Sequence, residues 1–354
     1  MPHSLNYTYL NTNLSHRKPL SENLRSSYTS HPTQKMNFTT HLLTTNQPLY
    51  LSSTTSAFLA AAARGQVPKS ILGRWLANDR LYIHAYIKGA GRLLALLDLP
   101  DIVATATPEA GGQEDASELD AGSATVTERL LSWLIEALVN VRREEKFFVD
   151  VASRFGVDVN LPAAHTSESS GADSDRRVSS EDKNAGLRAF ERLFSAIDIT
   201  SPPSALLPWL APAVLFWATE KCYLEAWSGA KGMIPSSAPA TSTSAASTSA
   251  TSASGTSSTN ATTSGKDTDT DLDGGALRTE FIPNWSSPEF RAFVDQLAAI
   301  IDDGVDEAVQ LHGEAAIKPE LERASAMWRE VLLAENDFWP GEMEEGGLRS
   351  VPSA

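Results

Sequence analysis

Apolar side chains recur every three to four positions over long segments of this chain. Between residues 71 and 87 they form one stripe, made of Leu72, Trp75, Leu76, Tyr82, Ile83 and Tyr86. A helix places residues three and four apart on the same face. The same period runs through residues 54–63, 69–97, 127–155, 185–196, 205–232, 287–311 and 319–338, and no segment alternates apolar and polar residues as a half-buried strand does. The sequence therefore predicts an all-α fold in which long helices pack as a bundle.

Residues that start and stop helices support several of these segments. Pro288 follows two serines, and Pro319 opens the last segment; proline is favoured in a first turn because its missing N–H has no helical partner there. Gly156 and Gly232 stand where their segments end, as glycine does after many helices. We therefore expect helix boundaries at these positions.

Charge and composition exclude several classes of protein. The formal net charge is −15, so the surface repels phosphate backbones and anionic lipids, and we expect neither nucleic-acid nor membrane binding. No apolar run reaches the roughly 18–20 residues that a membrane span needs. Cys222 is the single cysteine, which excludes an intramolecular disulfide and fits a reducing, cytoplasmic location. The oligomeric state stays open, with a homo-oligomer as one alternative.

Four segments lack the apolar residues that a packed helix requires. We expect residues 1–39 to form a disordered tail and residues 105–124, 163–184 and 236–270 to be disordered insertions, because they are rich in Ser, Thr, Ala, Gly or charge. The first 35 residues also resemble a mitochondrial transit peptide, and Met36 is an alternative start. One helical domain at residues 40–345 remains.

Two carboxylates interrupt the apolar stripes. Asp79 falls inside the stripe of residues 71–87, and Glu335 falls inside a stripe formed by Trp328, Val331, Leu332, Phe338 and Trp339. A carboxylate on a buried face needs a partner, a raised pKa or a chemical role. Two of them facing one core predict a polar cavity among the helices. The alternative is that each is a structural hydrogen-bond anchor.

Several short motifs, in order along the chain, resemble those of the TenA/thiaminase II family. They are Trp75-Leu76-Ala77-Asn78-Asp79-Arg80-Leu81-Tyr82, Leu210-Ala211-Pro212-Ala213, Phe281-Ile282-Pro283-Asn284-Trp285-Ser286-Ser287-Pro288-Glu289-Phe290 and Glu335-Asn336-Asp337-Phe338-Trp339. Asn78 stands where the family has Gln, and Trp285 stands where it has Tyr. The resemblance extends from about residue 54 to residue 339 and implies a haem-oxygenase-like helical bundle.

The resemblance also implies a function in thiamin salvage. Members of this family hydrolyse an aminopyrimidine derived from thiamin and release ammonia. By position, Asp79 would bind the pyrimidine, Tyr82 would stack on it or bond to it, and Glu335 would transfer protons. Trp285 would stack or donate from its indole nitrogen. We expect no cofactor and no metal, since no ligand pattern for either is recognisable.

The family's nucleophilic cysteine is missing. Ala213 occupies its position, and Cys222 lies about two and a half turns further on, on the opposite side of the helix. A branch of the family without the cysteine employs a second glutamate. Glu220 is the candidate here, and it would pair with Glu335 as one acid and one base. Alternatively, Glu220 marks a helix surface.

Other interpretations remain open. Glu144 and Glu145 lie in a run of charged residues and predict a solvated helix face with ion pairs. The whole chain could also be a non-catalytic module of the same fold that binds a small heterocycle or a protein partner, or, as a third alternative, a cofactor-dependent oxidase. An aminopyrimidine hydrolase that employs Glu335 and Glu220 is the function that the sequence predicts.

Overall fold

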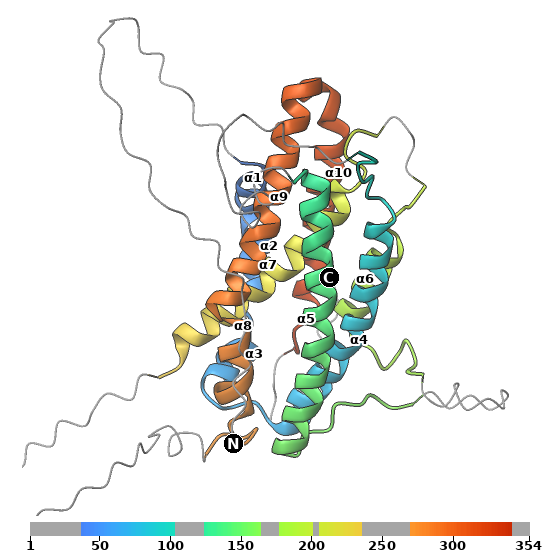
Figure 1. Cartoon of the computed structure of the whole chain (residues 1–354). Helices are drawn as coiled ribbons and strands as arrows, with labels where there is room; N and C mark the ends of the chain where they lie inside the picture. The colour runs from blue at the N-terminus through green and yellow to red at the C-terminus, as the bar shows by residue number, and fades with distance from the viewer. Residues whose placement is uncertain (1–36, 103–123, 164–176, 201–204, 236–269, 342–354) are drawn as a thin grey trace, which may run out of the picture.

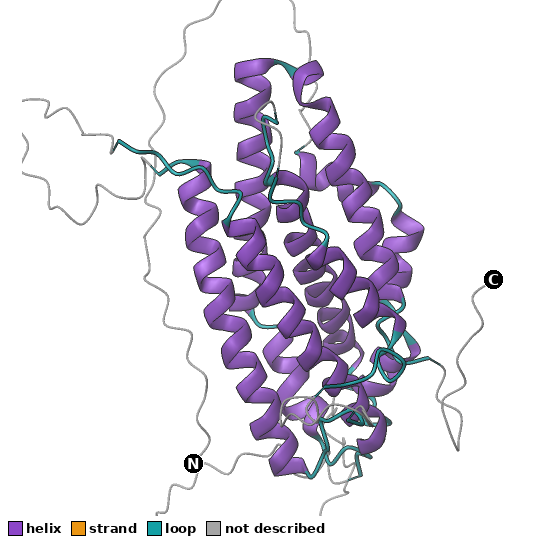
Figure 2. Ribbon diagram, turned by 90° about the vertical axis from the view of Figure 1, so that its right-hand side faces the viewer, coloured by secondary structure: helices purple, strands orange, loops and turns teal. Residues whose placement is uncertain are grey.

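The described part of the chain is helical, and the prediction of an all-α fold is confirmed. A computed structural model describes residues 37–102, 124–163, 177–200, 205–235 and 270–341. Within these ranges there is no strand, and Figure 2 shows only helices and loops. One isolated antiparallel bridge joins Ala163 and Val178. The helices are α1 (Phe38–Thr44), α2 (Gln47–Thr54), α3 (Ala57–Ala63), α4 (Lys69–Leu94), α5 (Val126–Phe155), α6 (Ala185–Ser195), α7 (Leu210–Met233), the π-helical η2 (Leu277–Phe281), α8 (Ile282–Trp285), α9 (Pro288–His312) and α10 (Glu314–Asn336).

Helix α7 lies at the centre of the bundle. It packs against α2, α3, α8, α9 and α10, and most of its side chains are buried (Figure 1). A helix that is apolar on nearly every side is stable only when other helices surround it. Polar residues on α7 that face inward, such as Thr219, are therefore exceptions that need partners.

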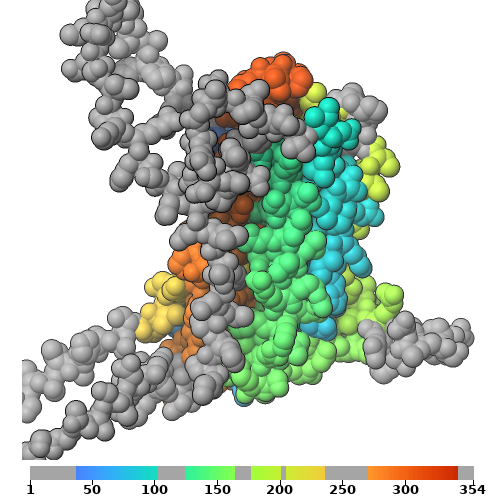
Figure 3. All heavy atoms as spheres, viewed as in Figure 1, coloured from blue at the N-terminus to red at the C-terminus, as the bar shows by residue number. Residues whose placement is uncertain are grey.

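Helices α4, α5 and α6 form the neighbouring wall. Helix α4 packs against both α5 and α6, and α5 also contacts α9. Figure 3 shows α5, in green, running along α4, in blue to cyan, on one face of the molecule. Because α4 carries Asp79 and α7 carries Glu220, the space between these two helices and α5 is the place where their carboxylates meet.

Local sequence signals set where the long helices begin and end. Thr125 and Glu128 form a reciprocal capping box at the start of α5, and Gly156 ends this helix in the left-handed conformation at φ 64°. Ser287 caps α9, and Pro288 occupies its first turn as predicted. These signals explain why the predicted and observed boundaries differ by few residues.

Several boundaries differ from the prediction, most of all in α7 and α10. Helix α10 begins at Glu314, so Pro319 lies inside it and leaves one helical carbonyl without its donor. Gly313, at φ 84°, separates α9 from α10 and makes the earlier start possible. Helix α7 begins at Leu210 instead of residue 205 and continues through Gly232 to Met233.

Most of the predicted unfolded segments lie outside the described residues. This applies to nearly all of the tail at 1–39 and of the insertions at 105–124, 163–184 and 236–270. Residues 177–184 are described, however. They form a turn that a hydrogen bond from Asn184 to Asn78 anchors to α4, whereas the sequence predicted a disordered insertion there. Among the described residues, no helix combines the length and the apolarity that crossing a bilayer requires.

The end of α10 is fixed by the start of α6. Asn184 caps α6 and donates its side-chain amide to the carbonyl of Phe338, at 3.1 Å. Gly186 donates its backbone N–H to the carbonyl of Asp337, at 3.2 Å. A Cβ atom on Gly186 would lie 2.5 Å from the backbone of Phe338, so only glycine permits this approach. The contact holds the last turn of α10, which carries Glu335.

We predict that Gly186→Ala destabilises the protein. The added methyl group would push α10 away from α6, and overpacking of this kind typically costs about 1–3 kcal/mol. Gly229→Ala is the matched control, because Gly229 is exposed on α7 and a Cβ atom added there would meet no other atom within 4 Å. The control should be stabilised by about 0.5–1 kcal/mol. Urea unfolding of both variants measures the difference, and equal effects would contradict the close contact.

Candidate functional site

A cavity of about 390 Å³ lies among α4, α5, α7, α8, α9 and α10. The residues that the sequence predicted for the site all line it: Asp79, Tyr82, Glu220, Trp285 and Glu335. They come from distant parts of the chain, and their chemical roles stay predictions. The volume is in the range of about 300–1,000 Å³ that small-molecule sites occupy.

Asp79 is held by a tyrosine on the facing helix. Asp79 is 5 % exposed, and the hydroxyl of Tyr223 donates a hydrogen bond of 2.9 Å to Asp79 Oδ2. Burial raises the pKa of Asp79 well above its ordinary value, and the charge of Glu144 raises it further, while the bond from Tyr223 opposes the rise. An acid in these surroundings takes up a proton readily or accepts a bond from a cationic ligand.

Glu335 faces the same cavity from the last turn of α10. It is 4 % exposed, and burial raises its pKa well above the ordinary value, with further contributions from the charges of Asp79 and Glu220. The pKa of Glu220 is raised to about 8 by burial and then by the charge of Glu144, against the lowering effect of the Tyr86 hydroxyl. Burial therefore disfavours the ionised form of all three carboxyl groups.

Glu144 is a cavity residue that the sequence interpretation missed. It was expected on a solvated face, but it lines the cavity and accepts a hydrogen bond of 2.6 Å from Trp285 Nε1. Burial raises the pKa of Glu144 to about 7. Its neighbour Glu145 contacts Arg80 and His84 of α4, at 3.9 and 2.9 Å, and so pairs across helices instead of at the i,i+4 spacing that was expected.

A signal for Glu144 was present in the sequence. Val141 and Phe148, three positions before it and four after it, are buried on the same face of α5. Glu144 therefore interrupts an apolar stripe in the way that Asp79 and Glu335 do. The run Arg142-Arg143-Glu144-Glu145-Lys146 concealed this, because every residue beside Glu144 in it is charged.

Aromatic rings form the remaining walls. The ring of Trp285 lies 5.2 Å from that of Tyr223, edge to face, and 4.7 Å from that of Trp227. Tyr82 packs edge-on against Phe190, with the ring centroids 5.0 Å apart. Such rings offer faces to a flat ligand or to a cation. The π-helical segment η2 immediately precedes α8 and presents Trp285 to the cavity.

Two residues from the sequence motifs do not reach the cavity. Ala213 is buried in the core and is not part of the cavity lining. Asn78 instead accepts a bond from the backbone N–H of Asn184 at 2.9 Å and donates to the carbonyl of Arg74 at 2.8 Å. Asn78 therefore anchors α6 against α4.

Cys222 is also outside the cavity lining. Its sulfur lies 3.9 Å from the hydroxyl of Ser53, in a buried position between α7 and α2. Burial raises the pKa of this thiol well above its ordinary value, so it stays protonated and is a poor nucleophile. Among the described residues, no cluster of three or more His, Cys, Asp and Glu side chains has metal-site geometry.

Comparisons with known proteins give distant similarities. No protein-family model matches the chain. A protein from Fusarium pseudograminearum described as a probable transcription factor is 25% identical over 295 residues, which cover 82% of this chain and 51% of that protein. The chain thus spans about half the length of this curated relative. A solved TenA homologue from Pyrococcus furiosus is 17% identical, with a TM-score of 0.49, and the match covers 85% of this chain and 98% of that one.

We predict that the empty protein becomes less stable as pH rises from about 5 to about 8. The pKa of Glu220 is raised from 4.5 to about 8, and that of Glu144 from 4.5 to about 7. The folded state therefore binds these protons more tightly than the unfolded state. Their contribution to stability is complete below pH 4.5 and is lost as pH rises through the raised values.

Glu220→Gln should weaken this pH dependence, because the neutral amide has no proton to lose. Glu307→Gln is the control, since Glu307 is exposed on α9 and is not part of the cavity lining. Urea unfolding across the pH range gives the free energy of unfolding at each pH. A stability that rises over this range in the parent protein would contradict the buried acid cluster.

Proposed function

We propose that this protein binds an aminopyrimidine in the acidic cavity and hydrolyses it, as in thiamin salvage, within a bundle of the haem-oxygenase-like type. One observation carries the proposal: the carboxyl groups of Asp79, Glu220 and Glu335 line a single cavity that also has aromatic walls. The sequence motifs that resemble TenA/thiaminase II contribute Asp79 and Glu335 to this cavity.

Recognition of the ligand follows from Asp79. An aminopyrimidine presents an amino group beside a ring nitrogen, and a carboxyl group can accept from the first and share a proton with the second. Because burial and Glu144 raise the pKa of Asp79, a proton is available for this sharing. Trp285 and Tyr82 supply ring faces on which a flat heterocycle can stack.

The proposed reaction replaces an exocyclic amino group by a hydroxyl group. Water supplies the oxygen, a carbon–oxygen bond forms, the carbon–nitrogen bond breaks, and ammonia leaves. Glu335, whose pKa is raised well above its ordinary value, donates a proton to the leaving nitrogen. In its ionised form Glu220, whose pKa is about 8, accepts the proton of the attacking water. Water is assigned as nucleophile because Cys222 and Ala213 are not in the lining.

The second candidate is a non-catalytic module that binds a small cationic heterocycle. The observation in its favour is that the polar groups of the described lining include carboxyl, hydroxyl and amide groups and the guanidinium of Arg143, with no thiol among them. The relative described as a probable transcription factor, of which this chain spans about half, fits a ligand-binding role better than catalysis. Ammonia release distinguishes the two candidates.

We predict that Glu335→Gln lowers the rate of ammonia release from 4-amino-5-aminomethyl-2-methylpyrimidine by about 10²–10⁴-fold, since general acids usually contribute that much. Glu330→Gln is the matched control, because Glu330 is exposed on the same helix. Cys222→Ser should leave turnover nearly unchanged. Turnover that survives Glu335→Gln within a few-fold would remove Glu335 from the mechanism.

We predict that Asp79→Asn weakens binding of the same aminopyrimidine more than tenfold and leaves the empty protein equally or more stable, since binding groups are often held at the expense of stability. Thermal unfolding with and without the aminopyrimidine measures both effects. If Asp79 is a structural anchor for Tyr223, the empty variant should instead lose about 1–3 kcal/mol. A ligand-induced shift without ammonia release in the parent protein would favour the non-catalytic module.

A further inference from the structure

A second, separate cavity of about 360 Å³ lies between α4, α6 and the turn at residues 177–184. We call it the basic groove, because its lining gathers Arg80, His84, Lys88, Arg177 and Lys183, with Glu191 as its acidic residue. The chain as a whole has a net charge of −15, so a concentration of basic groups in one hollow is unexpected. None of these residues lines the acidic cavity.

The guanidinium group of Arg80 has unfilled donors. Its side chain is 24% exposed, and its Nε atom is buried without a hydrogen-bond partner among the described residues. Its other nitrogens make only long contacts, at 3.5 Å to Asn160 Oδ1 and 3.9 Å to Glu145 Oε1. A guanidinium presents donors in a planar fork that matches phosphate and carboxylate oxygens.

The acidic groups nearby do not neutralise the groove. Glu191 bonds to Lys183 at 2.6 Å, and Glu145 is shared among His84, Arg80 and Arg142. Lys88 and Arg177 are exposed and have no ion-pair partner in the described part of the chain. The groove therefore carries a positive charge that its own carboxylates leave uncompensated.

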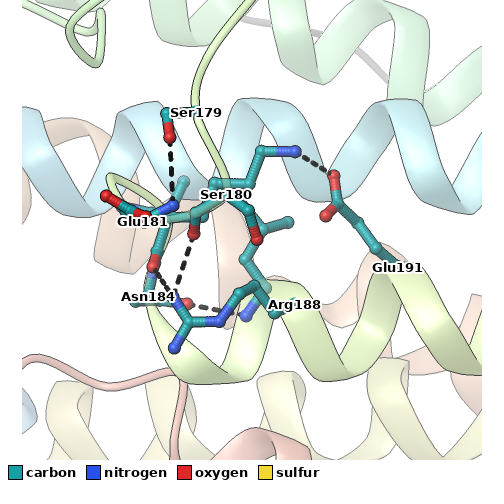
Figure 4. A network of polar contacts seen from close by, with 9 residues as sticks. Ser179, Ser180, Glu181, Asn184, Arg188 and Glu191 are labelled. Carbon is teal, nitrogen blue, oxygen red and sulfur yellow. Dashed lines mark hydrogen bonds and ion pairs between the residues drawn. The ribbon is translucent and has the colours of Figure 1, made fainter. Parts of the chain in front are cut away.

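The wall that carries Lys183 is held in place before any ligand arrives. Arg188 donates to the carbonyl oxygens of Ser180 and Lys183, and Ser179 accepts a bond from the backbone N–H of Glu181 (Figure 4). Asn184 donates its backbone N–H to Asn78 of α4 at 2.9 Å. A basic group on an anchored turn loses less conformational freedom on binding than one on an unattached loop.

We propose that the basic groove binds a small phosphorylated molecule. The fork of Arg80, with Lys88, Arg177 and Lys183, would contact the phosphate oxygens, and a dianion matches the surplus of positive charge. Leu81, Ala85 and Phe194 line the same groove and offer apolar contact to an organic body. A nucleic acid is disfavoured, because the acidic surface outside the groove repels an extended phosphate backbone. The proposal is independent of the function assigned to the acidic cavity.

The test compares two double variants of equal charge. Lys88→Gln/Arg177→Gln removes exposed basic groups from the groove, and Arg74→Gln/Lys231→Gln removes exposed basic groups elsewhere on α4 and α7. Titration calorimetry at constant ionic strength measures binding of inorganic phosphate and of phenyl phosphate to the full chain. A short DNA duplex is the third probe.

We expect phenyl phosphate to bind more tightly than inorganic phosphate, because its ring contacts the apolar side of the groove. The groove variant should lose about tenfold or more in affinity for both, and the control variant should match the parent protein. No binding of either phosphate, or an equal loss in both variants, would overturn the proposal. If the parent protein and the control variant bind the duplex and the groove variant does not, the groove is a nucleic-acid surface, and this result would also overturn the proposal.

Discussion

The removal of carboxyl groups from water is the constraint on which this structure depends. Asp79, Glu144, Glu220 and Glu335 lie among apolar helices, and burial raises the free energy of ionising each of them; neighbouring carboxylates raise it further for Asp79, Glu220 and Glu335. The bonds from Tyr223 to Asp79 and from Trp285 to Glu144 offset part of that cost. Buried acids of this kind need a rigid framework, because helices that could move apart would admit water to them. The helix caps and the tight contact of α6 with the end of α10 provide that rigidity.

Helix α4 separates two chemically opposite surfaces. Asp79 borders the acidic cavity, whereas Arg80, rotated about 100° around the helix axis, borders the basic groove. Phe194 lines the groove and also packs against Tyr82 and Tyr86, which line the cavity. The two hollows therefore share an aromatic layer but no charged side chain, and their ligands would be recognised by opposite charges.

Much of the framework could be predicted from the sequence because long helices carry strong local signals. The periodic stripes and the caps at Ser287 and Gly156 located most helices, and the stripes also exposed Asp79 and Glu335 as buried acids. The short helices α1, α2 and α8 were not predicted, since each has too few turns to show a period and is stabilised by tertiary contacts. Glu144 was misassigned because neighbouring charges hid its place in a stripe. The basic groove was not foreseen, because its residues come from segments whose spatial relation the sequence does not specify.

The position of Glu335 near the end of α10 has a consequence for how the bundle is synthesised. Chains grow from the amino terminus, so Asp79 leaves the ribosome long before Glu335 is added. Helix α10 packs against α2, α6, α7 and α9, and without it the apolar side chains of α7 that face α10 are uncovered. The nascent bundle therefore stays incomplete until α10 has been synthesised, and termination before α10 would yield a fragment with exposed apolar surface that is prone to aggregation.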